Sequence, residues 1–320
     1  MLFLIYFLLV FLVVGIVRVG SRKSLARLVV TVPGIGTVTA RRFARSIMLR
    51  NVGTLAAGGV ALWALDRVNQ AQPGWYGLPL MLAPGLAAAI GLLVFALTPT
   101  RIVTDRPKRR SANLVPRRVW TYGPAWGFLL PLCAAVAVVV VVVVFTIIAG
   151  LTASAPPDGA FRSITIGSRT AGPYPGWYYG VPLIGLTVLL AAATLFALGR
   201  IASAARSEQF DELDRSVRVL ATRVVMQLSS GALFLYSGGV LLVAGWATRN
   251  AAITFLPGGA ISAVQPAAAF GLTELVAGLV VALLGGVLVS LSILDATTQP
   301  LGRVYPARAS TANAASTQHS

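Results

Sequence analysis

The chain has few of the side chains from which enzyme active sites are usually built. Only 11% of its 320 residues are charged, nine are acidic, and there is one cysteine and one histidine. The lone cysteine, Cys133, excludes an intrachain disulfide and a multi-cysteine metal site. The lone histidine, His319, follows Asp295 in a polar, small-residue-rich tail that we expect to be disordered. Such a tail would position it poorly for acid–base catalysis.

Other patterns that carry chemistry are missing as well. The sequence has no glycine-rich phosphate loop, no carboxylates in a metal-binding pattern and no nucleophile with a base. A catalytic site inside a membrane needs at least two ionisable groups held together, and this chain offers little to build one. We therefore expect no catalytic residues, no metal and no cofactor, which argues against an enzyme.

The abundant residues are apolar. They make up 57% of the chain, and the mean hydropathy is +0.81. A helix that crosses a bilayer needs about 20 such residues. The 52–65 stretch is short, and we expect it either to borrow Ile47-Met48-Leu49 or to be accommodated by thinning of the bilayer. We expect an all-α integral membrane protein with seven transmembrane helices, at 1–17, 52–65, 77–98, 123–151, 179–199, 224–247 and 271–294.

The net charge of +17 is distributed between alternate loops. Of the 26 basic residues, 22 lie after the first, third, fifth and seventh apolar stretches, and 4 lie in the other loops. Basic loops stay in the cytoplasm, so the pattern predicts the N-terminus outside and the C-terminus inside. Insertion and attraction to anionic lipid explain the positive charge without nucleic acid. The first stretch lacks a basic n-region and a small-residue cleavage site, which favours an uncleaved anchor.

A duplicated motif organises the chain. Pro73-Gly74-Trp75-Tyr76-Gly77 returns 102 residues later as Pro175-Gly176-Trp177-Tyr178-Tyr179-Gly180, each time before a long apolar run. The copies define a parallel repeat of helical hairpins, unlike the inverted repeats of many transporters. The expected segments are a 1–18 anchor, a 19–50 basic segment, a 51–98 hairpin, a 99–122 basic loop, a 123–199 hairpin, a 200–223 amphipathic segment, a 224–295 hairpin and a 296–320 tail.

Two explanations fit the repeated turn. Trp75, Tyr76, Trp177 and Tyr178 are suited to the headgroup boundary, where an apolar ring and a polar tip are both accommodated. In that interpretation the turns are interfacial anchors, and Pro79 and Pro182 begin the next helix in its first turn. Alternatively, the paired aromatic residues form an outer surface that binds a ligand or partner.

Four of the nine acidic residues cluster before the sixth apolar stretch. Phe210, Leu213, Val217 and Leu220 recur at helical spacing there, and the charged residues occupy the rest of the circumference. One interpretation is a solvated amphipathic lead-in stabilised by i,i+4 pairs from Asp211 to Arg215 and from Asp214 to Arg218. The other is a helix at 208–218 that docks a cytoplasmic protein through Asp211, Glu212 and Asp214.

Glu274 is the one acidic residue well inside a predicted span. Buried ionisable groups in membranes suggest function because their burial is costly. Here the predicted depth is shallow, so solvation by Thr273 or water competes with a proton- or cation-linked role. The sixth stretch also has a polar face, which is either interhelical glue or the lining of a cavity. Its members are Gln227, Ser229, Ser230, Tyr236 and Ser237.

The segment from Arg169 through Pro182, with the Asp211-to-Arg218 motif, resembles a group of uncharacterised actinobacterial polytopic membrane proteins. The resemblance covers roughly residues 100–225. It implies a gene near GntR-type regulators and transport genes, and it brings no activity or catalytic residue. The excess of Arg over Lys and the abundance of Ala, Val and Gly also suggest a GC-rich bacterial host.

Together these patterns predict a multi-pass protein of the plasma membrane with a non-enzymatic accessory or regulatory role in the cell envelope. The main alternative is a small transporter or export component that uses Glu274 and the polar face of the sixth stretch. A lipid-modifying enzyme is the third alternative. The sequence identifies no substrate and no oligomeric state.

Overall fold

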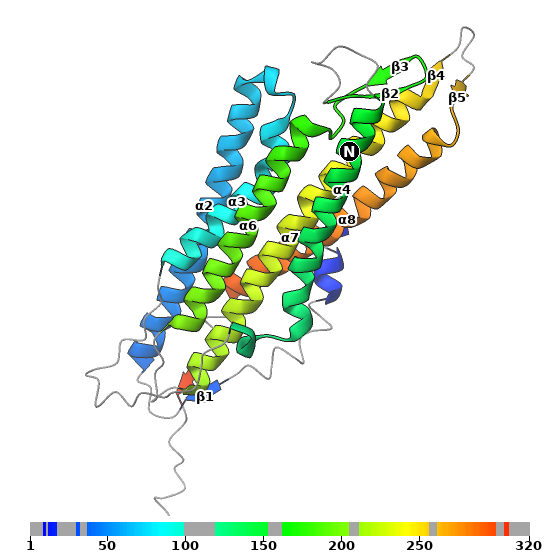
Figure 1. Ribbon diagram of the computed structural model, residues 1–320. Helices are drawn as coiled ribbons and strands as arrows, with labels where there is room; N and C mark the ends of the chain where they lie inside the picture. The colour runs from blue at the N-terminus through cyan, green and yellow to red at the C-terminus, as the bar shows by residue number, and fades with distance from the viewer. Residues whose placement is uncertain are drawn as a thin grey trace, which may run out of the picture.

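A computed structural model describes residues 9–10, 12–17, 30–32, 37–98, 119–152, 162–204, 211–255, 261–298 and 304–306. Long helices dominate this part of the chain, in agreement with the expected all-α class (Figure 1). They are α2 (Thr37–Ala71), α3 (Leu78–Leu97), α4 (Ala125–Leu151), α6 (Trp177–Ser203), α7 (Asp211–Ala252) and α8 (Ala267–Thr298), with 3-10 turns η1 (Pro73–Trp75) and η2 (Val119–Tyr122).

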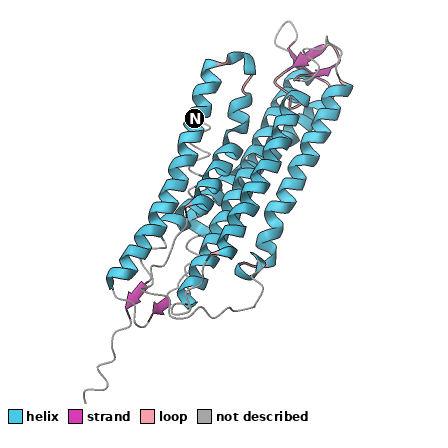
Figure 2. Cartoon of the chain, turned by 60° about the vertical axis from the view of Figure 1, so that its left-hand side comes forward, coloured by secondary structure: helices cyan, strands magenta, loops and turns pink. Residues whose placement is uncertain are grey.

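The long helices run side by side, so the bundle has two ends (Figures 1 and 2). The aromatic end, as we call it, holds η1, the start of α6 and two antiparallel strand pairs. These pairs are β2 (Ile164–Ile166) with β3 (Arg169–Ala171), and β4 (Ile253–Phe255) with β5 (Ile261–Ala263). The opposite end, the basic end, holds η2, the start of α7 and the parallel pair β1 (Val30–Val32) and β6 (Val304–Pro306).

Six helices in the described residues are long and apolar enough to cross a membrane. They correspond to the last six of the seven expected spans. The span from α2 covers Arg45–Ala71 and so includes the Ile47-Met48-Leu49 extension. Of the expected first span, residues 9–10 and 12–17 are helical, and Val10 and Val14 pack against Val287 of α8. The chain is a polytopic membrane protein by its helices.

The hairpin of α7 and α8 is held by an antiparallel seam of glycines. The glycines recur every seventh residue in both helices, a spacing that keeps them on one face along a left-handed supercoil. A Cβ on Gly238 would lie 2.5 Å from the backbone nitrogen of Ala282, and one on Gly245 would lie 2.6 Å from the carbonyl oxygen of Gly271. The two backbones therefore approach as closely as small residues allow. The seam consists of Gly231, Gly238 and Gly245 facing Gly285, Gly278 and Gly271.

The lead-in expected before the sixth span is not a separate element. α7 runs without a break over 42 residues from Asp211 to Ala252. It lies against α3, α4, α6 and α8 and is the central helix of the bundle. The amphipathic segment and the span are one rod because the helical spacing of apolar residues continues across their boundary.

The run of consecutive valines from Val138 to Val144 in α4 is helical, because inside a bilayer only a helix or a closed barrel satisfies the backbone hydrogen bonds. Val138 and Val142 are buried against the core, whereas Val136, Val140 and Val144 are exposed. This pattern leaves one face of α4 for contact with lipid. Exposed apolar side chains on all the spans have the same explanation.

Two expectations for helix boundaries differ from the structure. Pro182 is the sixth residue of α6, because the helix already begins at Trp177, and so it lies beyond the first turn. Within the 19–50 basic segment, Val30–Val32 pair with Val304–Pro306. The helix expected to end by Asp295 continues to Thr298, so the tail is not wholly without structure in its described residues.

Candidate functional site

The two repeated turns lie against each other at the aromatic end. The hydroxyl of Tyr179 donates a hydrogen bond of 2.8 Å to the carbonyl oxygen of Tyr76, and the hydroxyl of Tyr178 donates one of 3.3 Å to that of Trp75. The rings of Tyr76 and Tyr178 meet edge to face, with centroids 6.5 Å apart. The guanidinium of Arg162 covers the Tyr76 ring at 4.0 Å. The copies thus form one tyrosine clasp, our name for Tyr76, Tyr178 and Tyr179, between α3 and α6.

The two copies adopt different local structures. In the first copy Tyr76 and Gly77 have left-handed backbones, with φ of 49° and 80°, and α3 begins after them. In the second copy Trp177 is already the first residue of α6. The inserted Tyr179 is fully buried and supplies the shorter hydrogen bond of the clasp. The single-residue insertion therefore makes the second copy complementary to the first.

Tryptophan side chains mark both ends of the bundle. All six are exposed, from 48% to 70%. Trp63, Trp75, Trp177 and Trp246 belong to the half of the bundle with the aromatic end, and Trp120 and Trp126 belong to the basic end. Gly123 lies between Trp120 and Trp126, and a Cβ on it would be 3.5 Å from Thr222 of α7. Thr222 precedes Trp246 by 24 residues on the same helix. At 1.5 Å per residue the belts are about 36 Å apart, which suits a bilayer core with its interfaces.

Three buried polar side chains gather at the aromatic end, and we call them the Glu274 cluster. Glu274 of α8 is 5% exposed, Thr248 of α7 is 2% exposed and Tyr174, in the loop before α6, is 0% exposed. Both carboxylate oxygens and both hydroxyls lack a hydrogen-bond partner within the described residues. Thr248 lies close enough to influence the Glu274 carboxyl, although the pair falls short of hydrogen-bond geometry. Burial, reinforced by the charge of Glu274, raises the pKa of Tyr174.

Glu274 is thus deeper than its sequence position suggests. It is the eighth residue of α8, about 10 Å along the helix from Ala267. The hydroxyl of Thr273, expected to solvate it, instead donates to the carbonyl oxygen of Ala269 at 2.9 Å. At the glycine seam the base of the Glu274 side chain packs against α7, because a Cβ on Gly245 would lie 2.9 Å from the Cβ of Glu274.

The polar face of the sixth stretch acts largely as interhelical glue. The hydroxyls of Thr187 and Tyr236 are 2.8 Å apart, and the hydroxyl of Thr194 donates to Ser229 at 2.9 Å. These two bonds lie seven residues apart on both α6 and α7 and join the helices along their length. Ser237 bonds within α7, to the carbonyl oxygen of Phe234. The carbonyl oxygen of the Gln227 side chain and the hydroxyl of Ser230 have no partner within the described residues.

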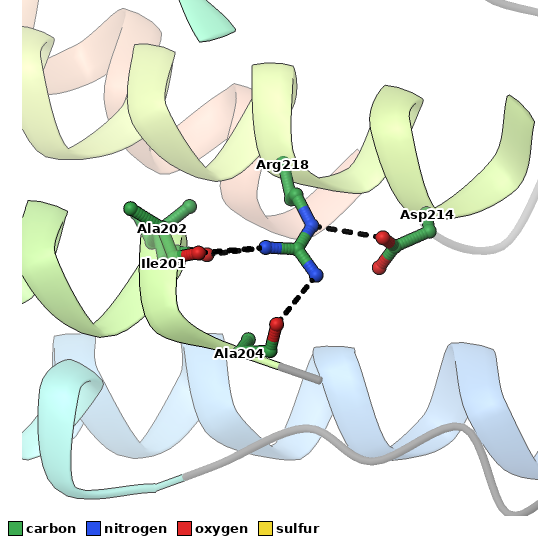
Figure 3. A network of polar contacts seen from close by, with 5 residues as sticks. All are labelled: Ile201, Ala202, Ala204, Asp214 and Arg218. Carbon is green, nitrogen blue, oxygen red and sulfur yellow. Dashed lines mark hydrogen bonds and ion pairs between the residues drawn. The ribbon is translucent and has the colours of Figure 1, made fainter. Parts of the chain in front are cut away.

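At the basic end, Arg218 caps the C-terminus of α6 (Figure 3). Its guanidinium donates to the carbonyl oxygens of Ile201 at 2.7 Å and Ala204 at 2.9 Å, and to Asp214 at 2.9 Å. A cation at a helix C-terminus is stabilised by the helix dipole. The expected Asp214–Arg218 pair is therefore confirmed, but Arg218 is only 5% exposed and does not belong to a solvated face. The side chains of Asp211 and Glu212 lie outside the described set.

Further polar contacts fasten the other helices at this end. Arg200 of α6 donates to the carbonyl oxygen of Ala96 near the end of α3. Asn51 of α2 donates to that of Ala296 on α8 at 2.8 Å. Arg223 of α7 pairs with Asp295 of α8 at 3.2 Å, so Asp295 is a structural partner as well as a helix-end residue.

The predicted site residues fall into two groups. Trp75, Tyr76, Trp177 and Tyr178 meet at the aromatic end, where Glu274 also lies, whereas Asp214 lies at the opposite end. The described residues contain no group of three or more His, Cys, Asp or Glu that could hold a metal ion. Sequence reasoning missed Tyr174 and Thr248. Only the Tyr between two prolines in Pro173-Tyr174-Pro175 hinted at a fixed aromatic residue.

Comparison of the chain with protein-family models, curated proteins and solved structures found no match.

Proposed function

We propose that the protein is a multi-pass plasma-membrane protein with its basic end in the cytoplasm, and that it acts as a non-enzymatic accessory or regulatory component of the cell envelope. The N-terminus would lie outside and the C-terminus inside. The basic loops support this orientation through the positive-inside rule. The host would be a bacterium with a GC-rich genome.

The observation that supports an accessory role best is the packing of α7 against α8. The glycine seam leaves no room for a Cβ at three levels, and unbroken helices extend from one end of the hairpin to the other. Many secondary transporters instead use interrupted helices and rock one repeat against another. Within the described residues, Arg200, Arg218 and the Arg223–Asp295 pair also fasten the helices at the basic end. Such a bundle suits a stable membrane scaffold.

A docking role for the start of α7 would rest on Asp211 and Glu212. Asp214 is the third carboxylate of that segment, and it already pairs with Arg218 at 2.9 Å. Reversing the charge of Asp214 would therefore disturb the cap of α6 as well as any docking surface. The other two residues lie in the first turn of α7, at the basic end of the bundle.

The test is a double charge reversal, Asp211→Lys with Glu212→Lys, followed by crosslinking and pull-down from native membranes. We expect the protein to stay at normal abundance and to lose a partner held by electrostatics. The matched control is Asp66→Lys, which changes charge at the other half of the bundle and should leave the partner bound. Retention of every partner by the double variant would contradict the docking role.

A small transporter is the second candidate, and the burial of Glu274 favours it. A coupling carboxylate must change its proton or its partner during each cycle, so Glu274→Gln would abolish transport while preserving the fold. We predict that the double reversal has the stronger cellular phenotype and Glu274→Gln the weaker one. The opposite ranking, with both variants at normal levels, would favour transport.

A further inference from the structure

The Glu274 cluster holds more polar atoms than it satisfies. Tyr174, Thr248 and Glu274 come from three separate segments, the loop before α6, α7 and α8. Each is at least nine-tenths buried, and their four side-chain oxygens lack a hydrogen-bond partner within the described residues. Buried polar groups are usually paired, so a cluster of unpaired oxygens calls for an explanation.

The cationic side chains described at this end are engaged elsewhere or exposed. Arg162 stacks on Tyr76. Arg169 donates to the backbone carbonyl of Ile253, and Arg249 in the last turn of α7 is exposed. The titratable residues of the tyrosine clasp, Tyr178 and Tyr179, donate hydrogen bonds to the carbonyl oxygens of Trp75 and Tyr76. Phe145 of α4 covers Tyr174 with ring centroids 5.7 Å apart and adds no charge.

An isolated carboxylate in such surroundings is costly because burial removes its charge from bulk solvent and no partner lies within the described residues. A neutralising positive charge would remove that cost. The available ligands are two carboxylate oxygens, one hydroxyl and one phenol, a hard oxygen set that suits a small cation and not a soft transition metal. A single carboxylate balances one positive charge.

We propose that Glu274, Thr248 and Tyr174 form a buried binding site for a small monovalent cation, either a proton or a sodium ion. The carboxylate supplies the negative charge. For a sodium ion the two hydroxyl groups supply further oxygen ligands, and for a proton they accept a hydrogen bond from the protonated carboxyl group. Glu274 faces Gly245 at the end of the glycine seam, so an occupied site would fix the aromatic ends of α7 and α8 against each other. The site is independent of the accessory role, since a scaffold and a transporter could both contain it.

The test uses the purified full-length chain in detergent. Thermal unfolding is followed by tryptophan fluorescence from mildly acidic to mildly alkaline pH, in sodium chloride and in choline chloride. The variants are Glu274→Gln, Thr248→Val and Tyr174→Phe. Asp66→Asn is the matched control, because that partly exposed carboxylate bonds only to Gln70 in the described residues.

A bound proton predicts that the midpoint falls as the pH rises, equally in both salts, because the native state keeps a proton that the unfolded chain releases. A bound sodium ion predicts that sodium raises the midpoint at alkaline pH whereas choline does not. Either dependence should vanish in Glu274→Gln and persist in Asp66→Asn. Infrared difference spectra should also show a carboxyl band that changes with pH or sodium and is missing from Glu274→Gln.

The proposal fails if neither pH nor sodium moves the midpoint of the wild-type protein. It also fails if Glu274→Gln keeps the wild-type dependence. Should Glu274→Gln not fold, Thr248→Val and Tyr174→Phe decide the question, because each removes one oxygen of the site. A weaker dependence in either variant supports the site, and an unchanged dependence in both overturns it.

Discussion

The glycine seam between α7 and α8 makes a prediction with a built-in control. Gly238 and Gly239 are neighbours in the same helix. A Cβ on Gly238 would lie 2.5 Å from the backbone nitrogen of Ala282 and 2.8 Å from its Cα, whereas a Cβ on Gly239 would meet nothing within 4 Å. Both Gly→Ala changes have the same effect on helix propensity, so any difference in stability between the two variants measures the cost of placing a methyl group in the glycine seam.

The expected magnitude follows from these distances. Ordinary contact begins at about 3.4 Å, so the helices must separate locally by about 1 Å to admit the methyl group of Gly238→Ala. Overpacking of this size costs about 1–3 kcal/mol. The gain in helix propensity, about 0.5–1 kcal/mol, applies to both variants. We expect Gly238→Ala to be less stable than Gly239→Ala by about 1–3 kcal/mol.

The assay is unfolding by increasing SDS in mixed micelles, followed by tryptophan fluorescence and by circular dichroism. Gly239→Ala should unfold at or above the wild-type midpoint, and Gly238→Ala should unfold below it. Equal free energies of unfolding for the two variants would refute the close approach of α7 and α8.

Three further changes probe the two ends of the bundle. Replacing Trp75 and Trp177 together by Ala should lower the amount of inserted, folded protein, because two interfacial anchors are lost, and unchanged abundance with a lost phenotype would favour a ligand surface instead. Arg218→Ala should destabilise the fold by about 3 kcal/mol. Arg218→Lys should recover only part of this stability, because an ammonium group cannot reproduce the planar set of donors of the guanidinium. Full stability of Arg218→Ala would contradict the role of Arg218 as the C-terminal cap of α6. Because the pKa of Tyr174 is raised, the folded protein keeps a proton that the unfolded chain releases near pH 10, and stability should fall as the pH rises above that value. Thermal melts of Tyr174→Phe should show a smaller loss of stability at alkaline pH. A loss identical to that of the wild-type protein would contradict the prediction.

The spans could be predicted because they depend on local composition. About 20 consecutive apolar residues must be helical in lipid. The structure agrees on six of the seven stretches, and even the valine run of α4 is helical. The glycine seam is also present in the sequence as a seven-residue spacing in two apolar stretches, but which glycines face each other depends on how α7 packs against α8.

The site could not be predicted to the same extent, because its members meet only in three dimensions. Helical periodicity assigns Arg218 to the charged side of α7, yet its burial depends on where α6 ends. Glu274 looked shallow by its place in the apolar run, and its isolation depends on Tyr174 and Thr248, which lie in two other segments. The repeated turns were visible, but their contact with each other required the packing of α3 against α6.

The central claim is a multi-pass bundle with its aromatic end outside the cell and its basic end inside. Single cysteines in a Cys133→Ala background, labelled in intact cells with an impermeant thiol reagent, test it directly. Cysteines replacing Ala71 and Ser168, which are exposed at the aromatic end, should react, whereas one replacing Ser203, exposed at the basic end, should react only after the membrane is permeabilised. Labelling of the Ser203→Cys variant in intact cells, with Ala71→Cys and Ser168→Cys protected, would contradict the orientation and the charge argument on which it rests.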